Sequence, residues 1–245
     1  MKYNQSKPKA NNRFQDKTKK TAWKNSKIVS IIKQDFERMV DKKDNGIFFC
    51  NQLLLSPTRL TKTFSEIDMI NIPENILNTR KEIGANLMSN LKTMFDNKTY
   101  NTNDLLINQR DRTYLNNLID FFLDNKIRIM AVEKFITNGT FCGYVDVIAK
   151  WNSVVVGFEI KCRNSNEIRF QDVVQSAIYK RMLHNIHFYI VLLNDNGTVT
   201  FYRAPTQRKY EQYTKLEKML KFYFEMGYLP SNKIEPIDIG VDDED

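Results

Sequence analysis

The apolar positions of the first half of the chain follow a helical spacing. They recur every three or four residues along Ser26–Val40, Pro73–Phe95 and Asp111–Leu123, which is the period of one helix face. Between the first two of these helices, Ile47–Cys50 has an extended pattern. Ser56-Pro57 then marks another helix start, because serine caps helices and proline fits the first helical position.

From residue 128 the pattern changes to the alternation typical of strands. The predicted strands are Arg128–Ile136, Thr140–Lys150, Val154–Lys161, Phe188–Leu193 and Thr198–Arg203. Tight turns at Asn138-Gly139 and Trp151-Asn152-Ser153 join the first three strands as hairpins. Helices are predicted over Ile168–Leu183, before the fourth strand, and over Gln207–Met226. This order indicates an α/β fold, a mixed central sheet flanked by helices with an N-terminal helical portion.

Length and composition are those of a single folded domain. The 245 residues are 42% hydrophobic, which suffices for one sizeable core. No apolar run approaches the roughly 18 residues of a membrane span, and no signal peptide is visible. Three cysteines without CxxC spacing argue against a disulfide framework and for a reducing cytoplasm. No Gly-rich phosphate loop is present, so no nucleotide cofactor is expected.

Charge is distributed unevenly along the chain. Residues 1–27 carry nine Lys/Arg and a single acid, Asp16, whereas the last eleven residues, from Glu235, carry six acids and no base. We therefore divide the chain into a basic flexible arm, 1–26, a single domain, 27–234, and an acidic tail, 235–245. The arm either contacts phosphates without reading sequence or is a solvated terminus.

Candidate chemistry lies on the second and third strands of the hairpin series. Residues two apart on a strand share a face, so Glu159 and Lys161 point the same way, and Asp146 on the adjacent strand can lie near Glu159. Two such carboxylates repel unless a cation lies between them. Mg²⁺ or Mn²⁺, with the Ile160 carbonyl as a further ligand, would resolve this, and Lys161 could stabilise a phosphoryl transition state. The alternative is an ordinary charge pair on a surface strand.

The helix that follows carries a polar row. Gln175 and Tyr179 are four residues apart and share a face, with Gln171 one turn earlier. Val174 and Ile178 belong to the apolar face beside this row. A helix that lines a site would have this pattern, and so would an ordinary amphipathic helix.

Together these residues resemble a known family. The motifs, in order, are Gly143-x-x-Asp146, Glu159-x-Lys161 and Gln175-x-x-x-Tyr179. This order resembles the PD-(D/E)xK nuclease superfamily and, within it, the RecB-type nuclease domain shared with lambda-type exonucleases and CRISPR adaptation nucleases. The resemblance covers about residues 55–205. It implies a restriction-endonuclease-like αβββαβ core, a divalent metal, cleavage of DNA phosphodiesters, and a Gln175 and Tyr179 that face the metal site and substrate.

Two further features fit the resemblance and one departs from it. Leu55-Ser-Pro-Thr-Arg-Leu60 is similar to the family's N-terminal helix start. Glu133 falls on the strand where such domains often carry a glutamate, which makes it another candidate metal ligand. The family usually has a His or Glu about four residues after a glycine on an upstream helix, whereas Gly84-Ala-Asn-Leu-Met88 ends in methionine, which does not suit Mg²⁺. Either Glu82 or Asn86 serves instead, or the second ligand set is weaker.

The function implied by the resemblance is a Mg²⁺- or Mn²⁺-dependent DNA exonuclease or end-processing nuclease. It would act in phage or bacterial recombination, repair or replication, in the cytoplasm of a bacterium or a phage-infected host. Alternatives are a structure-specific or restriction-type endonuclease, and a non-catalytic nucleic-acid-binding protein on a decayed nuclease fold. The lambda-type branch includes rings that encircle DNA, which leaves a homo-oligomer or a phage recombination partner open. The only histidines, His184 and His187, are expected to be structural.

Overall fold

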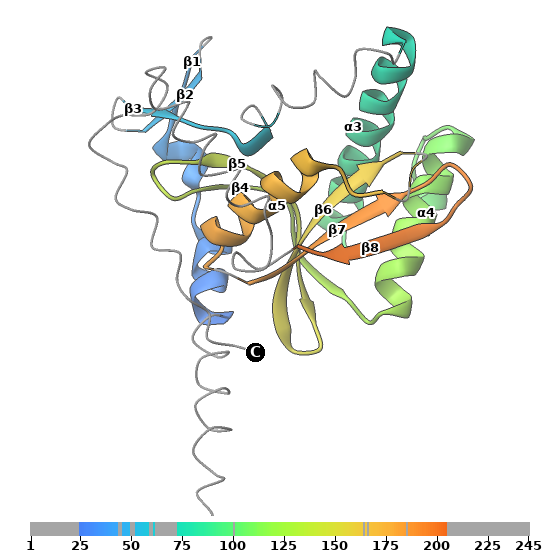
Figure 1. Ribbon diagram of the computed structural model, residues 1–245. Coiled ribbons are helices and arrows are strands. Elements are labelled where there is room, and N and C mark those ends of the chain that lie inside the picture. The colour runs from blue at the N-terminus through green and yellow to red at the C-terminus, as the bar shows by residue number, and fades with distance from the viewer. Residues whose placement is uncertain are drawn as a thin grey trace, which may run out of the picture.

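The computed structural model describes residues 25–204, except 44–45, 50–51, 59–60, 62–72, 100, 164, 166 and 185. Most of the expected basic arm, the predicted helix Gln207–Met226 and the acidic tail lie outside these residues. The described chain forms a three-stranded sheet, β1-β2-β3, and a five-stranded sheet, β4-β5-β6-β7-β8 (Figure 1). In the described part of the chain, no helix is long and apolar enough to cross a membrane.

The five-stranded sheet is mixed, as the sequence predicts. Its strands are β4 (Arg128–Thr137), β5 (Cys142–Trp151), β6 (Val154–Cys162), β7 (His187–Leu193) and β8 (Val199–Arg203). Only β6 and β7 pair in parallel, and the other neighbours are antiparallel. The crossover between β6 and β7 contains α5 (Phe170–Met182). The predicted α/β class and the order of three hairpin-linked strands, a helix and a strand are therefore confirmed.

Helices cover both faces of this sheet. The helices α3 (Glu74–Asp96) and α4 (Gln109–Asp124) pack on one face, and their buried Leu87 and Leu118 share a cluster with Phe158 of β6. On the other face, α5 and the helical residues 25–33 bury Ile178 and Ile28. Two separate cores, one on each side, hold the sheet rigid and fix the positions of the side chains at its strand ends.

The N-terminal helical region differs from the prediction. The helix expected over Ser26–Val40 ends at residue 33 and is followed by a short 3-10 helix, η1 (Phe36–Met39). The partly buried Phe36 packs against Phe135 and Cys142 of the β4–β5 hairpin. That tertiary contact takes the apolar side chain away from the helical row that the sequence spacing suggested.

The three-stranded sheet was only partly expected. It consists of β1 (Asp41–Lys43), β2 (Gly46–Phe49) and β3 (Gln52–Leu54), of which only the β2 region had been predicted as extended. A second 3-10 helix, η2 (Thr102–Asp104), precedes α4. Short strands of three or four residues carry too little alternation to be recognised in a sequence.

Both predicted hairpin turns are present. Gly139 has φ of 86°, and the side chain of Asn138 accepts hydrogen bonds from the backbone N–H of Thr140 and Phe141. In the second turn, Asn152 and Ser153 both have positive φ, 48° and 68°, between the paired residues Trp151 and Val154. Two left-handed residues in a two-residue loop match the right-handed twist of the flanking strands.

Two glycines offer a matched test of this packing. A Cβ added to Gly157 would lie 2.4 Å from the ring of the buried Phe188, whereas one added to Gly84 in α3 would meet nothing within 4 Å. Gly157→Ala should therefore lower the free energy of unfolding by about 1–3 kcal/mol through overpacking. Gly84→Ala should leave it unchanged or raise it by up to about 1 kcal/mol. Urea denaturation measures both, and equal stability of the two variants would contradict the packing described.

Candidate active site

The strands β5 and β6 separate at the position of the predicted site. Their pairing runs from Trp151↔Val154 to Val147↔Phe158 and ends there, although both strands continue. Beyond this point a side chain replaces the backbone as the acceptor. The Oδ2 of Asp146 accepts a hydrogen bond of 2.7 Å from the backbone N–H of Ile160. In Figure 1 the tip of the β4–β5 hairpin extends to one side of α5 and the end of β6 to the other.

A chain of polar contacts crosses from β6 to α5. The Nζ atom of Lys161 lies 2.6 Å from Oε1 of Glu159 and donates a hydrogen bond of 3.0 Å to Oε1 of Gln175. The Nε2 of Gln175 donates in turn to the hydroxyl of Thr58, at 3.1 Å. The shared strand face of Glu159 and Lys161, and their proximity to the helix row, are thus present in the structure.

Tyr179 packs closely behind this chain. A Cβ added to Gly143 would lie 2.6 Å from the Tyr179 hydroxyl and 3.3 Å from Cδ of Pro57. Only glycine leaves room for the phenol at this point of β5. The segment that carries Pro57 is held there by Leu55, whose backbone pairs with Thr140 and Cys142. The described part of the segment that resembled the family's helix start, residues 55–58, therefore lies against Gly143 and α5.

The carboxylates and the lysine shift one another's titration. Burial and the neighbouring Glu159 raise the pKa of the Asp146 carboxyl well above its ordinary value. Burial also raises the pKa of Glu159, although Lys161 opposes this. Burial by itself would lower the pKa of Lys161, but the surrounding carboxylates outweigh it and the pKa is raised. Lys161 is therefore an ammonium at neutral pH. Its single positive charge does not offset the burial and mutual repulsion of the Asp146 and Glu159 carboxylates, whose pKa values stay raised.

The backbone beside Asp146 is unusual. Glu133 has φ of 45° within β4 and falls opposite Asp146, between the pairs Val132↔Val147 and Lys134↔Val145. A left-handed conformation in the middle of a strand is costly for a residue with a side chain, and such conformations concentrate at functional sites. Its negative charge is one of the causes that raise the pKa of Asp146. The predicted ligand candidate Glu133 thus lies on the strand next to Asp146.

The donor set fits a hard divalent cation in part. In the described residues no group of three or more His, Cys, Asp or Glu side chains lies close enough together to hold a metal ion. Within the pair, however, Oε2 of Glu159 is buried and has no hydrogen-bond partner. A buried carboxylate oxygen without a partner is costly and is the kind of ligand that Mg²⁺ takes. Asp146, Glu159 and the Ile160 carbonyl would be its protein ligands, with water completing the shell.

The residues of the upstream helix, α3, occupy other positions than the metal site. Met88 is buried in the core between α3 and the sheet, and Asn86 donates a hydrogen bond of 2.8 Å to Asp111 of α4. Glu82 is exposed on α3. His187 begins β7 and pairs with Val156, three residues before Glu159 on β6, and its Nδ1 lies 2.6 Å from Nη2 of Arg203. The departure at Met88 therefore reflects core packing in this chain.

One buried ion pair beside the site was not anticipated. Arg163 directly follows β6, two residues after Lys161, and its Nη2 lies 2.5 Å from Oδ2 of Asp172 in the first turn of α5. Asp172 also accepts a hydrogen bond from the backbone N–H of Arg169. This pair joins the end of β6 to the helix that carries Gln175. The strand alternation that links Glu159 to Lys161 extends to Arg163 and would have singled it out.

Comparisons with known proteins give distant likenesses. No family model and no curated protein matches the chain. A solved structure named SSO0001 is similar over 87% of this chain and 88% of that one, with 13% identity and a TM-score of 0.38. An alkaline exonuclease from Laribacter hongkongensis is similar over 71% of this chain and 90% of its own, with 14% identity and a TM-score of 0.37.

The raised pKa of Asp146 predicts a pH-dependent stability. A carboxyl that holds its proton more tightly in the folded state destabilises the fold when it is ionised. The free energy of unfolding should therefore rise as the pH falls from above the folded pKa of Asp146 to the ordinary pKa of 3.8. Asp146→Asn, in the absence of divalent metal, should raise the free energy of unfolding at pH 8 by on the order of 1 kcal/mol. The gain should shrink as the pH is lowered.

The control for this experiment is Asp120→Asn, on the exposed face of α4. Denaturation curves between pH 4 and pH 8 compare both variants with the wild-type chain. If Asp146→Asn gave no more stability at pH 8 than Asp120→Asn, the burial of an unfavourable charge at Asp146 would be refuted.

Proposed function

We propose that this chain is a metal-dependent nuclease that hydrolyses DNA phosphodiester bonds at DNA ends. The observation that carries the proposal is the meeting of Asp146, Glu159 and Lys161 where β5 and β6 separate, with the Oε2 of Glu159 buried and unpartnered. The ordered motif from Gly143 to Tyr179 and its resemblance to the RecB-type nuclease domain support the same reading. DNA as substrate follows from that resemblance.

The proposed reaction assigns separate roles to the two carboxylates and to the lysine. Asp146 and Glu159 would hold Mg²⁺ or Mn²⁺, with Glu133 as a candidate further ligand from the next strand. A bound ion of this kind lowers the pKa of its water and neutralises charge on a phosphoryl oxygen. Lys161, charged at neutral pH, lies beside the pair and is suited to stabilising the additional negative charge of the transition state.

Gln175 and Tyr179 would complete the substrate side of the site. The side-chain oxygen of Gln175 holds the Lys161 ammonium, and its nitrogen is held by Thr58, so the amide orients the lysine. Burial raises the pKa of the Tyr179 phenol strongly, which keeps it a neutral hydrogen-bond donor at any working pH. Both side chains therefore act as fixed, neutral polar groups beside a charged lysine.

Two other functions remain as alternatives with distinct outcomes. A structure-specific or restriction-type endonuclease would use the same carboxylates, and it would cut closed circular DNA as well as linear DNA. A nucleic-acid-binding protein on a decayed nuclease fold would cut neither. Incubation of both substrates with Mg²⁺ separates the three functions, and loss of linear DNA alone is the result that the exonuclease proposal predicts.

Substitutions in the carboxylate pair and at Lys161 test the residue roles. Asp146→Ala or Glu159→Ala should abolish cleavage with little loss of DNA binding, since both are assigned to the metal. Lys161→Ala should lower kcat by roughly 10²–10³-fold with little change in KM, because its interaction is made mainly in the transition state. Single-turnover cleavage of end-labelled DNA at saturating Mg²⁺ measures these effects.

The matched control for Lys161→Ala is Lys150→Ala. Lys150 is exposed and pairs with Val155 near the start of β6, far along the strand from Lys161. It should cleave at the wild-type rate. A Lys161→Ala variant that cleaves within a few-fold of the Lys150→Ala variant would remove Lys161 from the mechanism.

We expect the basic arm to contribute to DNA binding independently of the candidate active site. Residues 1–24 carry eight Lys/Arg and one acid. The truncation should stop at residue 24, because the side chain of Asn25 bonds to the backbone of Ser153 and Val155 in the β5–β6 hairpin. Removing 1–24 should weaken DNA binding and flatten its salt dependence, since each phosphate neutralised contributes to the slope. An unchanged slope, measured between about 50 and 200 mM salt, would identify the arm as a solvated terminus.

A further inference from the structure

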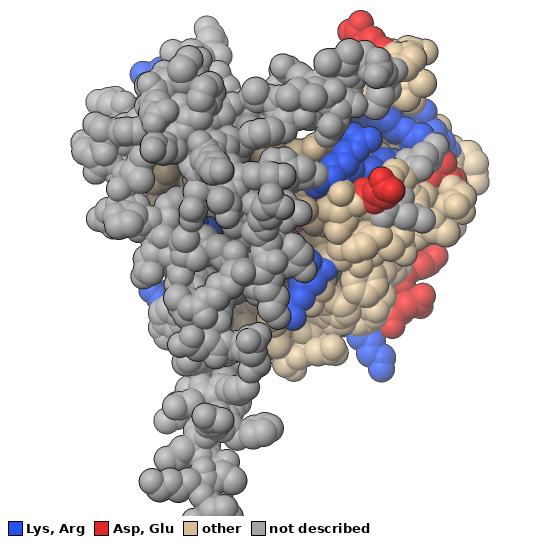
Figure 2. Space-filling model, in the orientation of Figure 1, with Lys and Arg blue, Asp and Glu red and all other residues tan. Residues whose placement is uncertain are grey.

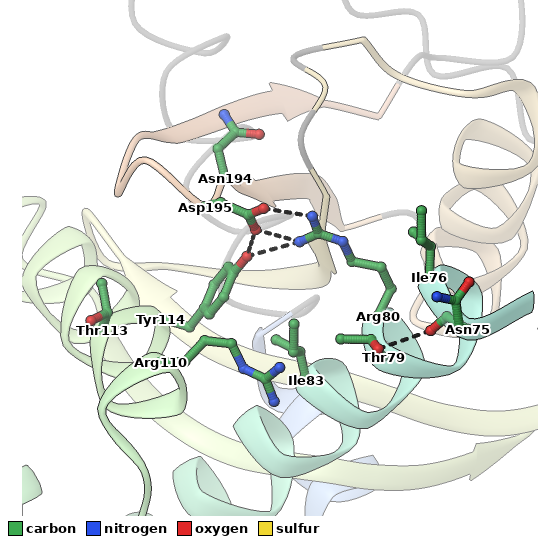
Figure 3. Close-up of a pocket in the computed structure, with 10 residues that line it drawn as sticks. All are labelled: Asn75, Ile76, Thr79, Arg80, Ile83, Arg110, Thr113, Tyr114, Asn194 and Asp195. Carbon is green, nitrogen blue, oxygen red and sulfur yellow. Dashed lines mark hydrogen bonds and ion pairs between the residues drawn. The ribbon is translucent and has the colours of Figure 1, made fainter. Parts of the chain in front are cut away.

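A cavity lies on the face of the sheet that α3 and α4 cover, the other face from Gln175. It has a volume of about 520 Å³ and is lined by α3, α4 and the turn between β7 and β8 (Figure 3). We call it the α3–α4 pocket. Ile76 and Ile83 of α3 provide apolar lining, and Ile76 is 47% exposed there. The rest of the lining is mainly polar, with two arginines.

The first arginine is already engaged. Arg80 of α3 forms an ion pair with Asp195 of the β7–β8 turn, and Asp195 also accepts a hydrogen bond from the hydroxyl of Tyr114 in α4. The Nη1 of Arg80 donates to the same hydroxyl at 3.0 Å. These three residues tie the two helices to the turn and form one wall of the pocket. The charge of Asp195 is thereby compensated within the wall.

The second arginine is available to a ligand. Arg110, in the first turn of α4, has its Nε 3.3 Å from Oδ1 of Asp111. The described residues supply no acceptor for its two terminal nitrogens. Figure 3 shows Arg110 extending from α4 towards Ile83, apart from the Arg80 guanidinium, which points to Asp195 and Tyr114. The pKa of Asp195 is lowered by the hydrogen bond from Arg80 and also by the charge of Arg110, so both cations act on the same small region.

The pocket adjoins the strand ends that carry the candidate active site. Asp195 lies two residues beyond the end of β7, and Leu193 at that end accepts a hydrogen bond of 2.9 Å from the N–H of Arg163, the residue after β6. Figure 2 shows Lys and Arg side chains gathered over this part of the surface, with Asp or Glu side chains beside them.

We propose that the α3–α4 pocket binds a nucleoside monophosphate unit, with Arg110 on its phosphate and the base against Ile76 and Ile83. A guanidinium whose two terminal nitrogens have no acceptor among the described residues matches two phosphate oxygens, and a pocket of this volume accepts a ligand of nucleotide size. The inference rests on the proposed function, because a nuclease brings nucleotides to these strand ends. The nucleotide belongs either to a bound DNA strand or to a released product.

The test is a calorimetric titration of the full-length chain with deoxythymidine 5′-monophosphate, without divalent metal. Arg110→Gln should weaken binding by about tenfold or more, since its charge-assisted hydrogen bonds are lost. The matched control is Arg128→Gln, an exposed arginine at the start of β4, which should bind as the wild type does. Deoxythymidine and inorganic phosphate, each titrated alone, should bind much more weakly than the monophosphate.

A competing single-stranded oligonucleotide separates the two sources. If it displaces the monophosphate, the pocket holds a nucleotide of the bound strand, and if both bind together, it holds a released nucleotide; either result supports the pocket. Binding unaffected by Arg110→Gln, or equal binding of inorganic phosphate, would overturn the inference. Parallel cleavage assays keep the two proposals apart. Cleavage without Arg110-dependent binding refutes only the pocket, and binding without cleavage refutes only the nuclease.

Discussion

The separation of β5 from β6 beyond the Val147↔Phe158 pair is the feature on which the candidate site depends. At this point the ladder of backbone hydrogen bonds is replaced by one bond from the Ile160 N–H to the Asp146 carboxylate. A carboxylate thus lies where two paired strands would leave no room for it, next to Glu159 and Lys161. The two cores on either side of the sheet keep the strands in this arrangement, although it buries charges that repel.

This arrangement also explains why α5 is polar on the side that faces the strand ends. Gln175 and Tyr179 are almost fully buried, although both are polar. Each has a role at the gap between the strands. Gln175 accepts from Lys161, and Tyr179 fills the space that Gly143 leaves open. The pair between Arg163 and Asp172 then fixes the start of α5 against β6. Stability and site geometry rest here on the same few contacts.

Much of this could be predicted because the relevant signals are local. Alternation along β6 placed Glu159 and Lys161 on one face, a four-residue spacing placed Gln175 and Tyr179 on one row, and two turn sequences identified the hairpins. The contacts that escaped prediction join residues far apart in the chain. Thr58 meets Gln175, and Arg80 meets Asp195, through the packing of separate elements, which no local period encodes. The helix that was expected to continue to Val40 ends earlier for the same reason, because Phe36 packs against the β4–β5 hairpin.

The most direct test of the central claim is to locate a metal ion. Crystals of the chain grown with Mn²⁺ should show an anomalous scattering peak between Asp146 and the unpartnered Oε2 of Glu159, within about 2.0–2.3 Å of a carboxylate oxygen of each. The same peak should be absent from crystals of Glu159→Gln. An ordered Mn²⁺ bound elsewhere, with none at this pair at saturating concentration, would contradict the account of the site.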